Sequence, residues 1–334
     1  MTAALTIATD KPRFARGWHV IGTGWDFPQG EAKSFSYFGT KIVAYRGEDN
    51  HVYVLDGYCP HMGADLGKGK VVANSIQCPF HHWQWGCDGA CEDIPYAKVV
   101  PPTAKIKAWP VCERNNLVFV WHDPENNLPY YEIPEMQECS SDEWLPWVVD
   151  TIHIPVHPRE LVDNVADKAH FGPVHGAPWH HFENQFIDHM AVQIMEARSE
   201  RLGKDLLKTT ATYYGPSYQI TVMEGDVESR LLNCHAPIDG NSFDLRFGVM
   251  VKKIPGKSDE EMREIANAYV AKAQEAFYED VEIWRHKTFL EQPLLCHADG
   301  HVMKLRKWYT QFYTDVADLP EAQRPQTYLE AYAS

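Results

Sequence analysis

Cys59-Pro60-His61-Met62-Gly63 and Cys78-Pro79-Phe80-His81 are the two segments that decide the fold of the first half of the chain, and sixteen residues separate His61 from Cys78. Each part offers one thiolate and one imidazole, and two short hairpin tips of this kind can hold one inorganic cluster between them. Gly67 and Gly69 allow the intervening loop to turn back tightly. A structural Cys2His2 zinc site is the alternative, but zinc fingers favour pairs of Cys in C-x2–4-C spacing. The pairing of each Cys with a His therefore favours an asymmetric iron–sulfur cluster.

In a Rieske [2Fe–2S] centre, two cysteines hold one iron and two histidines hold the other. The C-x-H and C-x2-H spacings predict that the cluster ligands are Cys59, His61, Cys78 and His81. His82 follows the last ligand directly and is predicted to lie at the rim. We interpret Cys87 and Cys91 as small buried or loop thiols.

A second group of potential metal ligands lies in the motif D-x2-H-x4-H, formed by Asp167, His170 and His175. Asp167 and His170 are three residues apart and share a face if this segment is helical. The pair Gly172-Pro173 is expected to break or kink the helix, which could bring both imidazoles to one point. Asn164, just upstream, is predicted either to line this site or to cap a helix. Taken alone, the two histidines could also be ordinary hydrogen-bonded side chains.

A long helix is predicted over Ser258–Leu290, opened by the capping-box sequence Ser258-Asp259-Glu260-Glu261. Its apolar residues recur every three or four positions, and this stripe continues to Asp280. A carboxylate on the buried face is costly unless a metal or a partner neutralises it, whereas Glu279 and Glu282 are predicted to be solvated. Asp280 therefore completes a predicted set of two histidines and one carboxylate for mononuclear non-haem iron(II).

The chain has 334 residues and a formal net charge of −15, which argues against affinity for nucleic acid or anionic membranes. Short β-favouring runs such as 41–46, 51–55 and 117–121 predict an all-β N-terminal domain, whereas residues 209–223 and 231–251 predict a sheet that precedes the long helix. The fold is thus expected to be α+β. The expected divisions are a cluster domain over 1–125, a linker over 126–155 and a catalytic domain over 156–334.

The beginning of the chain has no apolar run that resembles a signal-peptide core, and no segment approaches the roughly 20 apolar residues of a membrane span. We expect a soluble, cytoplasmic protein. The substrate pocket is expected to be apolar. Its wall is expected to draw side chains from Thr209–Met223, such as Tyr213, Tyr214 and Tyr218, together with Phe182 and Phe186.

The order and separation of the two ligand groups resemble the oxygenase component of a Rieske non-haem iron oxygenase. Several flanking segments are similar to the 3-ketosteroid 9α-hydroxylase group: 78–86, 94–98, 233–237, 280–287, 292–295 and 306–313. The resemblance covers essentially the whole chain. His82, where relatives often carry Asp, and Gly172-Pro173 depart from the pattern.

The resemblance places the cluster ligands at Cys59, His61, Cys78 and His81, the iron ligands at His170, His175 and Asp280, and a bridging aspartate at Asp167. It implies a helix-grip (START-like) catalytic domain and a homotrimer. It also implies an NADH-dependent flavin/iron–sulfur reductase as partner, and hydroxylation of a steroid-like substrate with O2. Two alternatives remain open: a Rieske O-demethylase or aromatic monooxygenase, and a Rieske electron carrier without enzyme activity. The carrier would need only the first ligand group.

Overall fold

The structure is a computed structural model that describes residues 12–199, 204–224 and 228–332. In these ranges, no helix has both the length and the apolar character needed to cross a bilayer. Residues 1–11, the greater part of the segment in which no signal-peptide core is predicted, lie outside the described ranges.

The N-terminal part is all-β and contains three antiparallel sheets with the strand orders β1-β11-β10, β2-β3-β4-β9 and β5-β6-β7-β8. Its strands are β1 (Gly17–Thr23), β2 (Ala32–Tyr37), β3 (Thr40–Arg46), β4 (Val52–Asp56), β5 (Lys70–Val72), β6 (Ser75–Gln77), β7 (Gln84–Trp85), β8 (Cys91–Asp93), β9 (Ala108–Trp109), β10 (Val111–Arg114) and β11 (Leu117–His122). The predicted hairpin is present as β3 and β4, which pair from Ile42 opposite Asp56 to Arg46 opposite Val52. Asn115 and Asn116 connect β10 to β11 with positive φ angles of 57° and 61°, as a two-residue hairpin turn requires.

The C-terminal part is built on a seven-stranded antiparallel sheet with the order β12-β18-β17-β16-β15-β14-β13. Its strands are β12 (Val148–Ile154), β13 (Trp179–Ile187), β14 (Met190–Ser199), β15 (Lys204–Tyr214), β16 (Tyr218–Glu224), β17 (Ser229–Asp239) and β18 (Ser242–Val251). The helices are α1 (Arg159–Asp163), α2 (Phe171–His175), α3 (Asp259–His286) and α4 (Val302–Thr310). The short 3-10 turns are η1 (Gly24–Asp26), η2 (Leu66–Lys68), η3 (Gln137–Ser140), η4 (Gln311–Tyr313), η5 (Val316–Asp318), η6 (Glu321–Gln323) and η7 (Glu330–Tyr332). The predicted α+β fold is confirmed.

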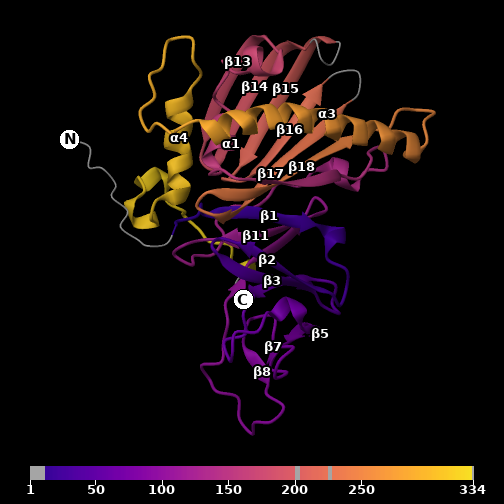
Figure 1. Cartoon of the computed structure of the whole chain (residues 1–334), viewed down its shortest axis with the longest axis vertical. Helices are drawn as coiled ribbons and strands as arrows, with labels where there is room; N and C mark the ends of the chain where they lie inside the picture. The colour runs from indigo at the N-terminus through magenta and orange to yellow at the C-terminus, as the bar shows by residue number, and fades with distance from the viewer. Residues whose placement is uncertain (1–11, 200–203, 225–227, 333–334) are drawn as a thin grey trace.

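Helix α3 lies across one face of the large sheet (Figure 1). Met262 and Ala266 on its buried side pack against Phe247 and Val249 of β18. The predicted capping box is present, because the Ser258 hydroxyl accepts from the Glu261 N–H at 3.2 Å and the Glu261 carboxylate accepts from the Ser258 N–H at 2.7 Å.

The helix ends at His286 rather than at the predicted Leu290. Just beyond this end, the Phe289 ring packs under two guanidinium groups, those of Arg159 at 3.6 Å and Arg306 at 4.5 Å from its centroid. These cation–π contacts join the segment that follows α3 to α1 and α4.

The segment predicted as a linker, 126–155, packs tightly between the two parts of the chain. Tyr131 and Trp147 belong to a core that also contains Trp18 of β1 and Tyr218 of β16. The last residues of the segment form β12, which pairs with β18 in the large sheet. The two parts therefore share a hydrophobic core, and this core fixes how the two predicted metal sites are placed in the chain.

Three buried imidazoles lie at this junction, those of His19, His122 and His235. The Phe38 ring stacks on His122 at 4.5 Å and meets His19 edge-on at 5.0 Å. Burial lowers the pKa of His19 to about 4 and also holds the pKa values of His122 and His235 below the ordinary range. The junction therefore contains imidazoles that are neutral near pH 7.

Acidification should weaken the fold through these groups. Below a pH of about 6.5 the unfolded chain binds protons that the folded chain does not, so the free energy of unfolding falls as the pH drops towards about 4. For His19 alone the loss between pH 7 and pH 5 is about 2 kcal/mol. His122→Phe, which preserves a flat ring, should show a smaller decrease of the urea midpoint over this range than the wild type. His51→Gln, at an exposed imidazole, is the control. Equal decreases in His122→Phe and wild type would contradict the assignment.

Candidate metal centres

The first predicted ligand loop, residues 59–64, is a tight backbone turn. The Cys59 N–H donates to the Ala64 carbonyl at 2.9 Å, and the Gly63 N–H donates to the Cys59 carbonyl at 2.8 Å. Gly63 has a φ of 77°, a left-handed conformation that glycine adopts without strain.

The second ligand loop, residues 78–83, repeats this geometry. The Cys78 N–H donates to the Trp83 carbonyl at 2.8 Å, and the His82 N–H donates to the Cys78 carbonyl at 3.1 Å. His82 has a φ of 60° and occupies the position that Gly63 has in the first loop. The two loops are thus matched turns, and His82 is an exposed turn residue, in line with its predicted place at the rim.

The four predicted cluster ligands converge between these loops. The Cys59 and Cys78 side chains are buried, and the ring centroids of His61 and His81 are 4.7 Å apart. Burial, with the neighbouring Cys78 thiol, raises the pKa of the Cys59 thiol. Nδ1 of His81 is buried and has no hydrogen-bond partner among the described residues. Two buried thiols and an unpartnered imidazole nitrogen form a donor set that fits a [2Fe–2S] cluster.

The second centre is formed around α2. His170 is the residue before the helix and His175 is its last residue, after which Gly176 reverses the chain with a φ of 60°. Pro173 was expected to break a helix, but it lies in the first turn of α2, where the backbone N–H groups have no helical partner. The helix is short enough for its two ends to present both imidazoles to the same point.

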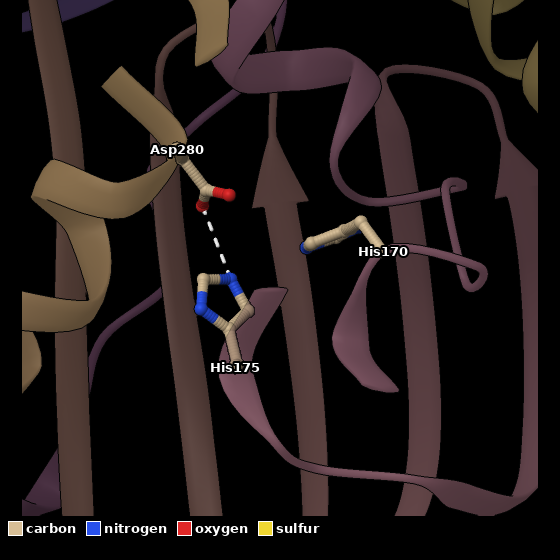
Figure 2. A group of neighbouring side chains, drawn as sticks. All are labelled: His170, His175 and Asp280. Atoms are coloured by element: carbon tan, nitrogen blue, oxygen red, sulfur yellow. Dashed lines mark ion pairs between the residues drawn. The ribbon is translucent and has the colours of Figure 1, made fainter. Parts of the chain in front are cut away.

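Asp280 reaches this point from α3. One potential ligand atom from each of His170, His175 and Asp280 lies within 4.8 Å of the others, and Figure 2 shows both imidazoles directed towards the carboxylate. The shortest contact joins His175 Nε2 and Asp280 Oδ2 at 3.3 Å. The chain thus brings together the three residues predicted as iron ligands, in a geometry that suits a facial two-histidine, one-carboxylate set.

The outer nitrogen of each imidazole has its own partner. His170 Nδ1 lies 2.5 Å from the Asp167 carbonyl oxygen, and His175 Nδ1 lies 3.3 Å from Glu279 Oε2. With Nδ1 donating to these oxygens, each Nε2 keeps its lone pair for a metal. Glu279 was predicted to be solvated, and its side chain is 38% exposed, but it also contacts this imidazole, which was not predicted. Its position next to Asp280 in the sequence was the available signal.

Asn164 performs both functions considered for it. It is the C-terminal cap residue of α1, and its Nδ2 donates to Asp280 Oδ2 at 3.0 Å. This contact orients the carboxylate. The side chain of Asp167 is 45% exposed, with Oδ2 3.8 Å from His170 Nδ1. Asp167 therefore faces outwards while it contacts an imidazole of the site.

The charges around the second centre favour a cation. Burial lowers the pKa of His175, but Asp280 and Glu279 outweigh this effect and raise its pKa. Burial raises the pKa of Asp167, and the hydrogen bond and charge of His170 outweigh it and lower that pKa. Two carboxylates next to a partly buried imidazole produce a negative potential that a divalent metal ion would neutralise.

A cavity of about 660 Å³ adjoins this centre, between α3 and the large sheet. Its walls include Leu161, Val165 and Phe277, but its floor carries Gln193, Gln219 and Asn233. The expectation of an apolar wall is therefore only partly met. Asn233 Nδ2 donates to Gln219 Oε1 at 2.9 Å, so a polar pair lies on the cavity floor.

The predicted segment 209–223 does line this cavity, through Thr209, Ala211, Gln219, Thr221 and Met223, but the five aromatic residues suggested for the wall do not. Neighbouring residues of a strand face opposite sides of a sheet. Gln219 faces the cavity, so Tyr218 lies on the other face, where it packs with Tyr214 in the core shared with the N-terminal part. Tyr213 lies on the cavity side but is buried with Trp308 of α4. Phe186 also packs against this cluster, and Phe182 contacts Phe171 at 6.1 Å between ring centroids.

Comparison with known proteins gives concordant results. Residues 120–313 match a family described as the 3-ketosteroid 9α-hydroxylase C-terminal domain, and residues 17–110 match the Rieske [2Fe-2S] domain. A 3-ketosteroid-9-alpha-monooxygenase oxygenase component from Rhodococcus rhodochrous is 44% identical, with 92% of this chain and 84% of the relative covered. The component from Mycobacterium tuberculosis is 41% identical, with the same coverage of 92% and 84%. Dicamba monooxygenase bound to dicamba has the same fold, with a TM-score of 0.74 and 20% identity over 90% of this chain and 98% of the other.

The ligand assignment predicts the iron content of each variant. The loaded protein should contain about three Fe per chain, two in the cluster and one at the second centre. Asp280→Ala should reduce this to about two without changing the visible absorption of the cluster, whereas Cys78→Ser should remove that absorption. Glu282→Ala, at an exposed carboxylate two residues from Asp280, should retain all the iron. Undiminished iron in Asp280→Ala would disprove its role as a ligand.

Proposed function

Since the chain belongs to the 3-ketosteroid 9α-hydroxylase family of Rieske non-haem iron oxygenases, we propose that it hydroxylates a 3-ketosteroid or a compound of similar shape. The protein is the oxygenase component of a monooxygenase, with a Rieske [2Fe–2S] cluster and a mononuclear iron as cofactors. When bound, the cluster supplies electrons singly and the iron supplies the chemistry of O2 activation.

The observation that carries the proposed substrate class is the cavity next to His170, His175 and Asp280. Its volume of about 660 Å³ lies within the range of roughly 300–1,000 Å³ that small-molecule sites occupy. Apolar side chains such as Leu161 and Phe277 offer contact area to a rigid hydrocarbon. A fused-ring substrate can therefore lie between α3 and the sheet with one carbon directed at the metal ligands.

The polar floor would hold one end of such a substrate. Gln219 accepts from Asn233 through its oxygen, so its Nε2 group is directed elsewhere and can donate to a ketone. A buried oxygen acceptor on the substrate needs a donor of this kind. The amide pair thus fixes the direction in which the ring system lies, and with it the carbon that faces the metal.

We propose that Cys59, His61, Cys78 and His81 hold the cluster, and that His170, His175 and Asp280 hold the iron. Asn164 positions Asp280 through the 3.0 Å hydrogen bond. The contacts of His170 and His175 through Nδ1 keep both imidazoles in the tautomer that binds metal through Nε2. These residues orient the ligands, while the apolar walls of the cavity exclude water from the reacting carbon.

The placement of the two centres supports electron transfer between chains. Strands β5–β8, which flank the loop of Cys78, lie at the far end of the long axis from α3 (Figure 1). We propose a homotrimer in which His81 of one chain lies against the half-exposed Asp167 of the next, and Asp167 connects it to His170. A cytoplasmic flavin/iron–sulfur reductase would take electrons from NADH and pass them to the cluster.

Product analysis tests the proposed substrate class. With a suitable reductase and NADH, the loaded protein should convert a 3-ketosteroid to a monohydroxylated product that carries one ¹⁸O atom from ¹⁸O2. A methoxy-aromatic panel should give no formaldehyde, because those smaller rings would not span the cavity from the amide pair to the metal ligands. Asp280→Ala is the inactive control. Formaldehyde release without steroid hydroxylation would contradict the proposal and favour an O-demethylase.

A further inference from the structure

Trp83 physically connects the two loops that carry the predicted cluster ligands. Its carbonyl oxygen accepts from the Cys78 N–H at 2.8 Å and closes the second loop. Its indole lies nearly parallel to the imidazole of His61 in the first loop, with ring centroids 4.6 Å apart and an interplanar angle of 11°. One residue thus ties the backbone of one loop to a ligand side chain of the other.

The two imidazoles have different surroundings. His61 is covered on one face by the parallel indole, whereas His81 meets the exposed ring of Phe80 at an angle of 37°. In the proposed electron route, His81 is the ligand that passes electrons to the neighbouring chain. His61 is the imidazole whose orientation the protein itself holds most firmly.

The indole is itself held from the solvent side. Trp83 Nε1–H donates to the Tyr96 hydroxyl oxygen at 2.7 Å, and the Trp85 ring lies behind it at 5.9 Å between centroids. The Tyr96 side chain is 63% exposed, so its hydroxyl also has access to water as a partner. The structural consequence of its hydrogen bond to Trp83 is to fix the plane of the indole over His61.

A parallel indole should affect a metal-bound imidazole in one direction. The face of an indole is electron-rich, and it attracts a positively charged or electron-poor partner. An imidazole bound to iron is poorer in electrons when the cluster is oxidised than when it is reduced. The stack should therefore stabilise the oxidised state of the cluster more than the reduced state. Contacts around metal ligands are known to change the reduction potential of a cluster in this way.

We propose that Trp83, oriented by Tyr96, is a positioning residue that lowers the reduction potential of the cluster through its stack on His61. This inference rests on the proposed set of cluster ligands. It gives Trp83 a role in setting the driving force for electron transfer. This role does not depend on which substrate the protein hydroxylates.

The test is a redox titration of the purified full-length protein, followed by the visible and EPR signals of the cluster, without substrate or reductase. Trp83→Leu should raise the potential, equivalent to about a two- to fivefold larger equilibrium constant for reduction. Tyr96→Phe should shift it in the same direction by a smaller amount. Trp25→Leu, at an exposed indole in the same part of the chain, should leave the potential unchanged.

The double variant Trp83→Leu/Tyr96→Phe distinguishes a linked pair from two separate effects. If Tyr96 acts through Trp83, the double variant has the potential of Trp83→Leu alone. An unchanged potential and EPR spectrum in both single variants with intact clusters, or fully additive shifts, would overturn the proposal. If Trp83→Leu fails to assemble a cluster, Trp83→Phe and Tyr96→Phe decide the question by the same titration. Nitrogen couplings in pulsed EPR report separately on whether two imidazoles bind, so a wrong ligand set is recognised independently.

Discussion

The structure depends on one buried carboxylate, that of Asp280, placed on the core side of a long helix and directed at two imidazoles. A carboxylate with 6% exposure is costly to bury without compensation. Here His175 and Asn164 contact one of its oxygens. This arrangement requires α3 to cross the sheet in one register, α2 to be a single short turn, and α1 to end at Asn164. The contacts of Asp280 therefore restrict where these three helices can lie, and the helices in turn fix the position of the carboxylate.

A second constraint is the division of the chain into a part that carries the cysteine loops and a part that carries the carboxylate. The shared core around Trp18 and Tyr218 holds the two parts together, and strands β5–β8, which flank the Cys78 loop, lie far from α3 along the long axis (Figure 1). Such a separation suits a protein that receives electrons at one surface and uses them at a cavity elsewhere in the chain. The proposed route between the centres therefore runs through a neighbouring chain.

Much of this arrangement is readable from local sequence rules. Alternation and turn residues predicted the hairpin of β3 and β4, and the capping box with its apolar stripe predicted α3 and singled out Asp280. The roles of the predicted site residues as ligands remain a prediction, although the fold brings them together. Local rules could not place Glu279, because its contact with His175 depends on how α2 packs against α3.

The remaining differences have the same origin in tertiary packing. The side of the sheet on which Tyr214 and Tyr218 lie depends on strand register. The stack of Trp83 on His61 depends on the contact between two loops that are separated in the sequence. Pro173 was expected to interrupt a helix, but the start of α2 at Phe171 places it where proline is tolerated. Each of these features depends on which segments pack against each other in the folded chain. The periodicity of the sequence does not specify that packing.

Complementation between two inactive variants tests the central claim most directly. One chain, Asp280→Ala, keeps the cluster, and the other, Cys78→Ser, keeps the second centre. Coexpressed and purified as mixed oligomers, they should regain steroid hydroxylation that neither shows alone, and adding Asp167→Asn to the Cys78→Ser chain should abolish it. The same substitution in the Asp280→Ala chain should have no effect. Mixed oligomers as inactive as the separate variants would contradict electron transfer from the cluster of one chain to the iron of another.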